Sequence, residues 1–547
     1  MENLYQRLSE YAAGSAYPLH MPGHKRRAFG VLPPEVFRMD ITEIDGFDNL
    51  HEPVEILKDL QERAAMLYGA DQSYCLVGGS TCGILSAISA ALPVGGHLLM
   101  ARNCHKSAYH AVYLRRLKVS YLWPKTMADF GICDSISAEQ VRKALEKNPD
   151  IGAVLIVSPT YEGRISPIRE IAQVVHSFGK ILIVDEAHGA HLGPIYRCRH
   201  VNLEKADSPS HADKKDSGPI TSEQTNCDEE TESCGSCMAG ADLVINSIHK
   251  TLPALTQTAL LHVNGERVDR RLLERYLRIY QSSSPSYILM AGIDNCLQVL
   301  EQDGKMLFRE FYTQFYDMMM QLAKCRKLRF LAANPNEKGG FRNSSRQDIG
   351  KLCVFAGEGG MNGQMLYTKL RTEYGIQPEM AAGDFCLLMF TVGDSKEGYE
   401  RTAQALQKID AQLLENASME QHDNEDPHGI RDTREVFEHM NACTDIKKDD
   451  ADTAGMQTAA GLSAEIPVWQ AWDLPYEEVP LTECAGRVAA EFVNLYPPGI
   501  PIVVPGECYT EEICKRLAGY VTRGLQVQGI QINRMTARCV KDNALLT

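Results

Sequence analysis

The chain has 547 residues, with 56 Lys and Arg against 71 Asp and Glu, and a formal net charge of −15. Its 44% hydrophobic and 23% charged residues form an ordinary globular composition, which excludes wholesale disorder, collagen-like chains and coiled coils. No apolar run approaches the ~20 residues that span a bilayer. The N-terminal segment MENLYQRLSEYAAG lacks the pattern of a signal peptide. We therefore expect a cytoplasmic protein of several domains with no membrane partner.

The negative charge is concentrated in two polar segments. Residues 201–240 contain nine acidic and three basic residues, and residues 415–452 contain twelve acidic and four basic residues. Since their net charges of −6 and −8 nearly account for the total, the rest of the chain is almost neutral. A nucleic acid would need a basic face, so we expect no such partner. We predict a disordered acidic insertion at 201–240 and an acidic linker at 415–463.

The 17 cysteines are scattered, and many lie in apolar segments. This distribution is typical of reduced, buried thiols in a cytosolic protein. Cys234 and Cys237 form a CxxC pair near Cys227 and His211. Three cysteines without a clear fourth ligand make a poor zinc site, so we predict no metal.

Short apolar runs alternate with polar turns and helical patterns between residues 72 and 263. The runs lie at 73–77, 97–101, 153–157, 181–184 and 242–246. The pattern predicts an α/β domain with a buried, mostly parallel sheet and helices on both faces. Ligands bind such sheets at the carboxyl ends of the strands. The polar residues that follow these runs are therefore the candidate site.

Two further α/β regions follow the large domain. Residues 327–414 contain strand-like KLCVFA and FCLLMFTV and helix-like MNGQMLYTKLRTEYG, which predict a small α/β domain. Residues 464–547 are expected to form a C-terminal α+β domain, with helices within ECAGRVAAEFVNL and TEEICKRLAGYVTRG. These two regions follow a predicted N-terminal arm over residues 1–70 and a predicted large domain over residues 71–326.

Four chemically suggestive features follow predicted strands of the large domain. A Gly-Gly-Ser-Thr turn at 78–81 opens a helix, where backbone N–H groups could cradle a phosphate. His105, Asp185 and Lys250 follow three other strands. Each of these residues, taken alone, has an ordinary explanation: His105 as a structural histidine, Asp185 as a helix cap and Lys250 as a surface lysine. Together they provide what pyridoxal phosphate (PLP) requires: a phosphate site, a stacking partner, a carboxylate for the ring nitrogen and an amine for the aldehyde.

Motifs along most of the chain resemble the Orn/Lys/Arg decarboxylases, which have the aspartate-aminotransferase fold (PLP fold type I). They are PLHMPGHKRR (18–27), TEIDGFDNLHEP (42–53), RNCHKSAYHA (102–111), SPTYEGR (158–164), VDEAHGAHLG (184–193), SIHKTLPALTQTA (247–259), QSSSPSY (281–287) and YPPGIPIVVPGE (496–507). The resemblance is collinear and fails only over 201–240 and about 415–463. It implies the lysine/arginine branch of the family.

The resemblance assigns a role to each site residue. Lys250 would form a Schiff base with PLP, and Asp185 would pair with the ring nitrogen. His105 would stack on the ring, and His188 would line the site. The phosphate would be held by Ser80, Thr81, Ser247 and His249. Lys250 or His249 would also return a proton to the substrate after decarboxylation.

The resemblance further implies a basic amino acid as substrate and an assembly of at least two chains. Thr160 would face the substrate, and Glu507 would face its distal cation, with Glu43, Asp45 or Asp48 as further candidates. Lysine, arginine and ornithine stay open as substrates. The family's site lies at a dimer interface, and the serines at 282–284 resemble the stretch that reaches the partner's cofactor. We therefore expect a homodimer or a higher homo-oligomer.

Three other functions compete with decarboxylation as the interpretation of this sequence. An aminotransferase of this fold would use a small-domain Arg to bind the α-carboxylate, and the strand at 385–392 contains none. A catalytically silent regulatory homologue would not need Lys250, Asp185 and His105. A nicotinamide-binding Rossmann domain would need a GxGxxG motif, which the sequence lacks.

Overall fold

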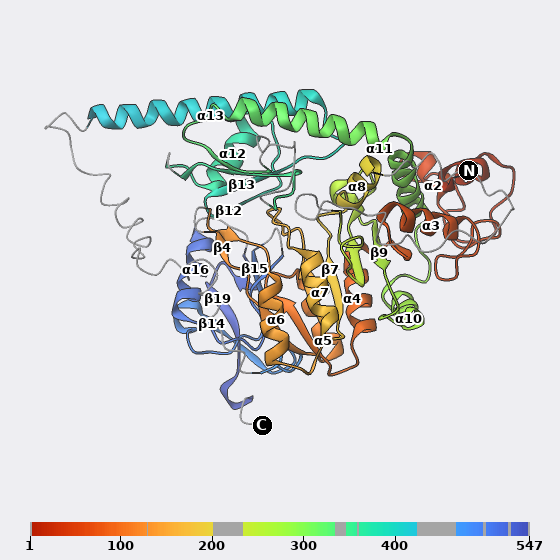
Figure 1. The fold of residues 1–547 in the computed structure, drawn as a ribbon, viewed down its shortest axis with the longest axis horizontal. Coiled ribbons are helices and arrows are strands. Elements are labelled where there is room, and N and C mark those ends of the chain that lie inside the picture. The colour runs from red at the N-terminus through yellow and green to blue at the C-terminus, as the bar shows by residue number, and fades with distance from the viewer. Residues whose placement is uncertain are drawn as a thin grey trace.

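The large domain is built on one seven-stranded sheet in the order β1-β9-β8-β7-β6-β2-β3. Figure 1 shows this domain, with β7 and β9 labelled, below the sheet that carries β12 and β13. The computed structural model describes residues 3–127, 130–200, 234–333, 346–357, 360–423, 466–495, 499–522 and 527–544. The strands are β1 (Gln72–Leu76), β2 (His97–Ala101), β3 (Lys118–Leu122), β6 (Ile151–Val157), β7 (Ile181–Asp185), β8 (Leu243–Asn246) and β9 (Ala259–Val263). Only β9 runs antiparallel to its two neighbours, β1 and β8. The predicted mostly parallel sheet is confirmed.

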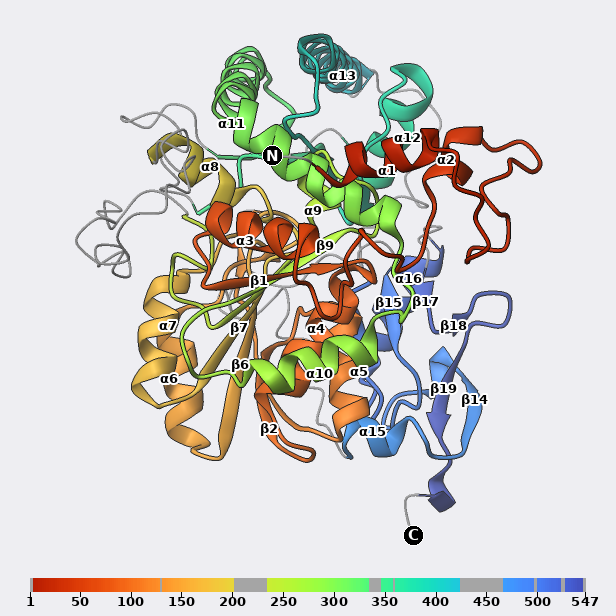
Figure 2. The same cartoon turned by 90° about the vertical axis from the view of Figure 1, so that its right-hand side faces the viewer.

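Helices cover both faces of this sheet, as predicted (Figure 2). α6 (Ala138–Lys147) and α7 (Ile168–Ser177) lie on one face, and α4 (Gly79–Ala91), α5 (Lys106–Arg115) and α10 (Arg270–Tyr280) lie on the other. α4 packs closely on the strands because Gly83 has no side chain. A Cβ there would lie 2.6 Å from Cδ1 of Leu76.

The N-terminal segment packs beside the large domain and against the long helix α11 (Tyr287–Leu322). It contains α1 (Leu4–Ala13), α2 (Pro34–Met39) and α3 (Ile56–Tyr68). α8 (Leu192–His200) also packs on α3 and α11. α11 continues from the large domain into the small domain, where its Phe311 and Phe315 enter that domain's core.

The small domain is a four-stranded antiparallel sheet in the order β10-β11-β13-β12. Its strands are β10 (Arg329–Leu331), β11 (Lys351–Phe355), β12 (Met380–Ala382) and β13 (Phe385–Met389). α12 (Gly363–Glu373), α13 (Lys396–Asp423) and α11 pack on one face, where Leu352 and Val354 point. Since successive side chains of a strand alternate, the side chains of Lys351 and Cys353 face the large domain instead.

The predicted segments 201–240 and 415–463 fall mostly outside the described residues. Residues 234–240 of the first are described, and α13 continues past position 415 to Asp423. Among the described residues, no helix is both long and apolar enough to cross a bilayer.

The C-terminal domain contains two three-stranded sheets, β14-β19-β18 and β16-β15-β17. Their strands are β14 (Tyr476–Pro480), β15 (Val493–Leu495), β16 (Pro501–Val503), β17 (Val527–Gln528), β18 (Ile530–Gln531) and β19 (Thr536–Val540). α16 (Glu511–Thr522) confirms the second predicted helix. The helix predicted within ECAGRVAAEFVNL is wrong, because Val488 and Ala489 form β-bridges to Cys508 and Cys539 before β15 begins. Consecutive buried residues, 488–490, fit extended chain and not one helix face.

Candidate active site

Lys250 and Asp185 lie at the same edge of the central sheet. Asp185 ends β7, and Lys250 lies in the short helix α9 (Ile248–Thr251), which follows the neighbouring strand β8. Burial raises the pKa of Asp185, and the nearby charge of Lys250 opposes that shift. Burial also lowers the pKa of Lys250, against the pull of Asp185. The two groups therefore share one site, as the sequence predicts.

His188 joins this pair from the turn after β7. Its Nε2 lies 3.0 Å from Nζ of Lys250. The pKa of His188 is far below its usual value, first because the ring is buried and then because lysine charges surround it. A neutral imidazole beside an amine can exchange a proton with it.

His105 lies at the start of α5, beyond β2. Its Nδ1 accepts a hydrogen bond from the backbone N–H of Ser107 at 3.2 Å, which caps the helix. Burial, followed by the charge of Lys250, lowers the pKa of His105 to about 4. The ring is therefore neutral at physiological pH, which suits a stacking role.

The predicted phosphate site is formed by the first turn of α4. The N-cap, Gly78, supplies no side-chain hydrogen bond, so the first backbone N–H groups of this helix are available for an anion. Val77, just before the turn, donates to Oε1 of Gln281 at 3.0 Å and accepts from Nε2 of Gln257 at 2.7 Å. Ser80 and Thr81 lie in the first turn of this helix.

Ser247 and His249 flank the site from the α9 side. Ser247 is fully buried, and its Oγ has no hydrogen-bond partner within the described ranges. Nδ1 of His249 donates to the carbonyl of Thr258 at 2.7 Å, which fixes the ring. A buried hydroxyl without a partner costs free energy unless a ligand satisfies it.

The residues at this edge fit PLP. A buried carboxylate, a half-buried lysine and a neutral histidine could surround the ring of the cofactor, and an unsatisfied hydroxyl and an open helix N-terminus could take the phosphate. This donor set pairs each polar part of the cofactor with a group of matching chemistry.

Glu507 and Thr160 lie in more constrained positions than expected. Glu507 is 2% exposed, and both its carboxylate oxygens are bonded to Arg102. This geometry gives no support to the prediction that Glu507 receives the substrate's distal cation, because that carboxylate is already neutralised. Thr160 is buried after β6, and its Oγ1 accepts from the backbone N–H of Arg164 at 3.1 Å.

The carboxylate of Asp48 also has a structural role. It accepts hydrogen bonds from the backbone N–H groups of Val54, Glu55 and Leu57. Burial opposes its ionisation, but these bonds outweigh burial and lower the pKa of Asp48. Asp48 therefore organises its own loop.

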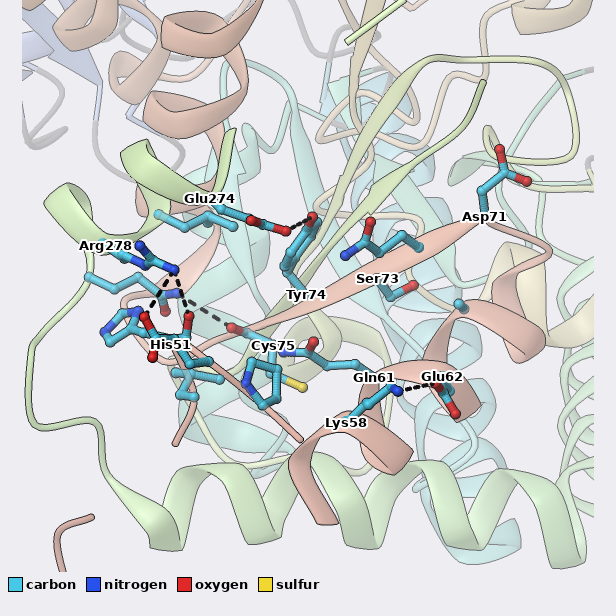
Figure 3. A pocket seen from close by; sticks show the side chains of 17 residues that line it. His51, Lys58, Gln61, Glu62, Asp71, Ser73, Tyr74, Cys75, Glu274 and Arg278 are labelled. Atoms are coloured by element: carbon cyan, nitrogen blue, oxygen red, sulfur yellow. Dashed lines mark hydrogen bonds and ion pairs between the residues drawn. The ribbon is translucent and has the colours of Figure 1, made fainter. Parts of the chain in front are cut away.

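The motifs at 42–53 and 281–287 meet beside a pocket of about 470 Å³ (Figure 3). Nε2 of His51 donates to the carbonyl of Ser282 at 2.8 Å, and Arg278 donates to the carbonyl of His51 at 3.3 Å. Figure 3 shows Arg278 and His51 side by side, with Tyr74 and Glu274 paired next to them. The reach of the serines at 282–284 to a partner chain stays a prediction.

Three site residues were not predicted from the sequence. Lys351 of β11 places its Nζ 3.1 Å from Nδ1 of His188. The ring of Tyr161 lies 4.6 Å from that of His188, and its hydroxyl donates to Glu379. The sequence contained one signal for Lys351. This lysine begins the apolar run KLCVF, and a strand that is buried on both faces otherwise consists of apolar residues.

The CxxC pair does not build a metal site within the described part of the chain. Cys234 and Cys237 are buried, and Nη2 of Arg169 lies 3.6 Å from Sγ of Cys234. No cluster of three or more His, Cys, Asp or Glu side chains suited to a metal occurs in the described ranges. Cys227 and His211 lie outside them.

The fold and the lysine–carboxylate site define an enzyme of PLP fold type I. Residues 2–337 match the family description "Orn/Lys/Arg decarboxylase, major domain", and residues 470–523 match "Orn/Lys/Arg decarboxylase, C-terminal domain". The chain belongs to the Orn/Lys/Arg decarboxylase family.

Relatives of this chain include arginine and lysine decarboxylases. It is 28% identical to an arginine decarboxylase of Bacillus subtilis over 96% of this chain and 95% of that protein. It is 21% identical to a lysine decarboxylase of Pseudomonas aeruginosa over 93% and 74% of the two chains. The solved lysine decarboxylase A of Pseudomonas aeruginosa has the same fold, with a TM-score of 0.76 at 19% identity, over 99% of this chain and 80% of that one.

Proposed function

We propose that this chain uses PLP bound at Lys250 to decarboxylate a basic amino acid, lysine or arginine, with ornithine as a further candidate. The observation that carries the proposal is the position of half-buried Lys250, whose Nζ lies 3.0 Å from Nε2 of the neutral His188 ring and whose charge interacts with the buried carboxylate of Asp185. Membership of the Orn/Lys/Arg decarboxylase family supports the reaction type over transamination.

Lys250 would hold the cofactor aldehyde, and Asp185 would hold the protonated ring nitrogen. PLP, when bound, supplies an electron sink for the bond that is cleaved. His105 would cover the ring face, and the phosphate would lie between Ser247 and the first turn of α4. The lowered pKa of Lys250 increases the fraction of unprotonated amine, which is the nucleophilic form.

Asp185 would keep its charge only because a cation faces it. Its burial raises its pKa, so it needs a positive partner to stay ionised. Lys250 or His249 would deliver the proton that replaces the carboxylate. The bond from Nδ1 of His249 to Thr258 holds that ring beside Lys250.

The substrate's distal cation would meet Glu379 more readily than Glu507. Glu379 is exposed beside Tyr161, and its charge acts on both Lys250 and Lys351. Thr160 would line the same side of the site. This arrangement leaves the length of the substrate side chain open, which is why the test uses several amino acids.

We also propose a homodimer or higher homo-oligomer in the cytoplasm. Leu19, Val31 and Val54 are at least 74% exposed in the N-terminal segment, as apolar residues covered by a second chain would be. Many cysteines are buried in apolar surroundings as thiols, which suits a reducing compartment.

The test incubates the purified, PLP-loaded chain with lysine, arginine and ornithine. We expect CO₂ together with cadaverine, agmatine or putrescine, and no turnover by Lys250→Ala. A keto-acid product would indicate an aminotransferase. Turnover by Lys250→Ala, or the absence of CO₂ from every amino acid, would contradict the proposal.

A further inference from the structure

Two cysteines of the C-terminal domain are in contact through their sulfur atoms. Sγ of Cys539, on the central strand β19 of its sheet, donates a hydrogen bond to Sγ of Cys484 at 3.8 Å. Cys484 directly follows the short 3₁₀ turn Leu481–Glu483. Both side chains are free thiols and fully buried in the core of this domain. The two residues are 55 positions apart in the sequence, so the fold brings them together.

Hydrogen bonds fix the position of the Cys484 sulfur opposite Cys539. Besides accepting from Cys539, Cys484 donates its S–H to the carbonyl of Pro480 at 3.3 Å. Its backbone N–H donates to the carbonyl of Leu481 at 3.5 Å, and the N–H of Leu481 donates to the carbonyl of Met535 at 2.9 Å. A disulfide has an S–S bond of about 2.05 Å, so the two sulfur atoms must approach by about 1.8 Å. Rotation of the side chains about their Cα–Cβ bonds moves the sulfur atoms on this scale.

The two thiols differ in acidity. The hydrogen bond from Cys539 lowers the pKa of Cys484, against the effect of burial, and the charge of Arg487 acts in the same direction as the hydrogen bond. The same hydrogen bond raises the pKa of Cys539, and burial adds to this shift. The thiolate is the form that attacks a disulfide. Cys484 is therefore the first nucleophile, and Cys539 is the thiol that would resolve a mixed disulfide.

A thin layer of surface chain covers Cys484. The residues on either side of it, 482–483 and 485–486, are exposed, although Cys484 itself is buried. Short surface turns open locally at a much smaller cost in free energy than global unfolding. Such an opening presents the sulfur of Cys484 to a small oxidant, and closure returns it to Cys539.

We propose that Cys484 and Cys539 form a redox modification site, at which a low-molecular-weight disulfide such as oxidised glutathione produces a reversible disulfide bond. The Cys484 thiolate attacks one sulfur of the oxidant, releases one glutathione thiolate and forms a mixed disulfide. Cys539 then loses its proton, attacks the Cys484 sulfur and releases the second thiolate. The two cysteines lose two protons and two electrons in total, and the oxidant becomes two thiols. This inference does not rest on the proposed function.

The disulfide would brace the strand that lies beside the Glu507 turn. Ala489 forms a β-bridge with Cys539, and the backbone N–H of Ala489 donates to the carbonyl of Glu507 at 2.8 Å. A covalent bond between residues 55 positions apart removes conformational freedom from the unfolded chain. Oxidation should therefore raise the melting temperature of the C-terminal domain, provided that the native backbone fits the bond.

The test measures the equilibrium between the dithiol and the disulfide in the full chain. The chain is held in buffers with stepped ratios of reduced to oxidised glutathione, quenched with acid, alkylated, digested and mapped by mass spectrometry. The titration is repeated in concentrated urea, which unfolds the chain, and circular dichroism checks the folded state in its absence. Cys484→Ser removes the first nucleophile. Cys514→Ser is the matched control, because Cys514 belongs to the same core and is only 6% exposed.

We expect a pair of peptides joined through Cys484 and Cys539, lighter than the two free thiols by two hydrogen atoms and separated again by dithiothreitol. The effective concentration of the pair is the squared concentration of reduced glutathione divided by that of oxidised glutathione at half-oxidation. It should be at least roughly tenfold higher in the folded chain than in urea, because the fold holds the sulfur atoms together. Cys514→Ser should keep this value, and Cys484→Ser should lack the joined peptides. Mapping of the wild type decides the question if Cys484→Ser does not fold.

Three results would overturn the inference. The first is an effective concentration in the folded chain that is equal to or lower than the value in urea. The second is a folded chain in which Cys484 stays a thiol or pairs with a different cysteine. The third is a melting temperature that falls when the pair is oxidised, because the bond would then favour the unfolded chain.

Discussion

Arg102 and Glu507 form a buried, two-pronged ion pair between the large and C-terminal domains. Nε and Nη2 of Arg102 lie 3.2 and 2.9 Å from the two carboxylate oxygens of Glu507. Nη1 of Arg102 also donates to the carbonyl of Pro501 at 2.7 Å. Since Arg102 follows β2 and precedes His105 by three residues, this pair clamps the loop that carries the predicted stacking histidine.

Removing one member of this pair should destabilise the protein strongly. Glu507→Ala leaves the Arg102 guanidinium buried without its counter-ion, which typically costs about 3–5 kcal/mol. The double variant Arg102→Met/Glu507→Leu removes both charges and should be the more stable of the two. Thermal melting compares them. A raised KM with unchanged stability in Glu507→Ala would instead favour contact between Glu507 and the substrate.

Asp185→Asn should retain PLP and lose most of the rate. The amide occupies the same volume but cannot hold the ring nitrogen in its protonated form, so the electron sink is weakened. We expect kcat to fall roughly a hundredfold or more, as for the loss of a main electrostatic contact in a buried site. Cofactor absorbance checks binding, and amine release checks turnover. A kcat equal to that of the wild type would refute the role of Asp185.

Ser247→Ala should weaken PLP binding without weakening the fold. The buried Oγ of Ser247 makes no hydrogen bond to the described residues, so its loss removes only a contact to the ligand. One hydrogen bond to a charged group contributes about 1.5–3 kcal/mol, which corresponds to at least a tenfold loss of affinity. Ser86→Ala is the matched control, because that serine is equally buried and its Oγ also lacks a partner among those residues. Equal PLP affinities in the two variants would contradict the assignment.

Glu186→Gln should make stability less dependent on pH. Burial raises the pKa of Glu186 to about 7, from 4.5 for an unburied carboxyl. Because the folded-state pKa is the higher one, the contribution of Glu186 to stability is complete below pH 4.5 and is lost as pH rises through 7. At pH 8 the variant should be the more stable protein, by up to roughly 3 kcal/mol.

Melting temperatures of the wild type and Glu186→Gln from pH 5 to 8 check this sign. Gln can still accept from Ser236 through Oε1. Asn246 now donates from Nδ2 to Oε2 of Glu186 at 3.1 Å, so its side-chain amide must flip in the variant for its unpartnered Oδ1 to accept from the new amide. Parallel curves across this range would show that Glu186 does not titrate as described.

The sequence predicted the main strands of the large domain because buried parallel strands are short apolar runs with polar turns. The helix predicted within residues 483–495, from alanines and valines, is wrong. There, strand partners distant in sequence, Cys508 and Cys539, decide the backbone conformation. Local propensity does not contain that information.

The amino-acid sequence by itself determined that Asp185 and Lys250 meet, because both follow strands of one parallel sheet and the carboxyl ends of such strands share an edge. Only the tertiary structure decided that Lys351 joins them and that Glu507 is bound by Arg102. Both contacts join residues of domains that have separate hydrophobic cores. The packing of these domains against each other decides which face of β11, and which face of the C-terminal domain, contacts the large domain.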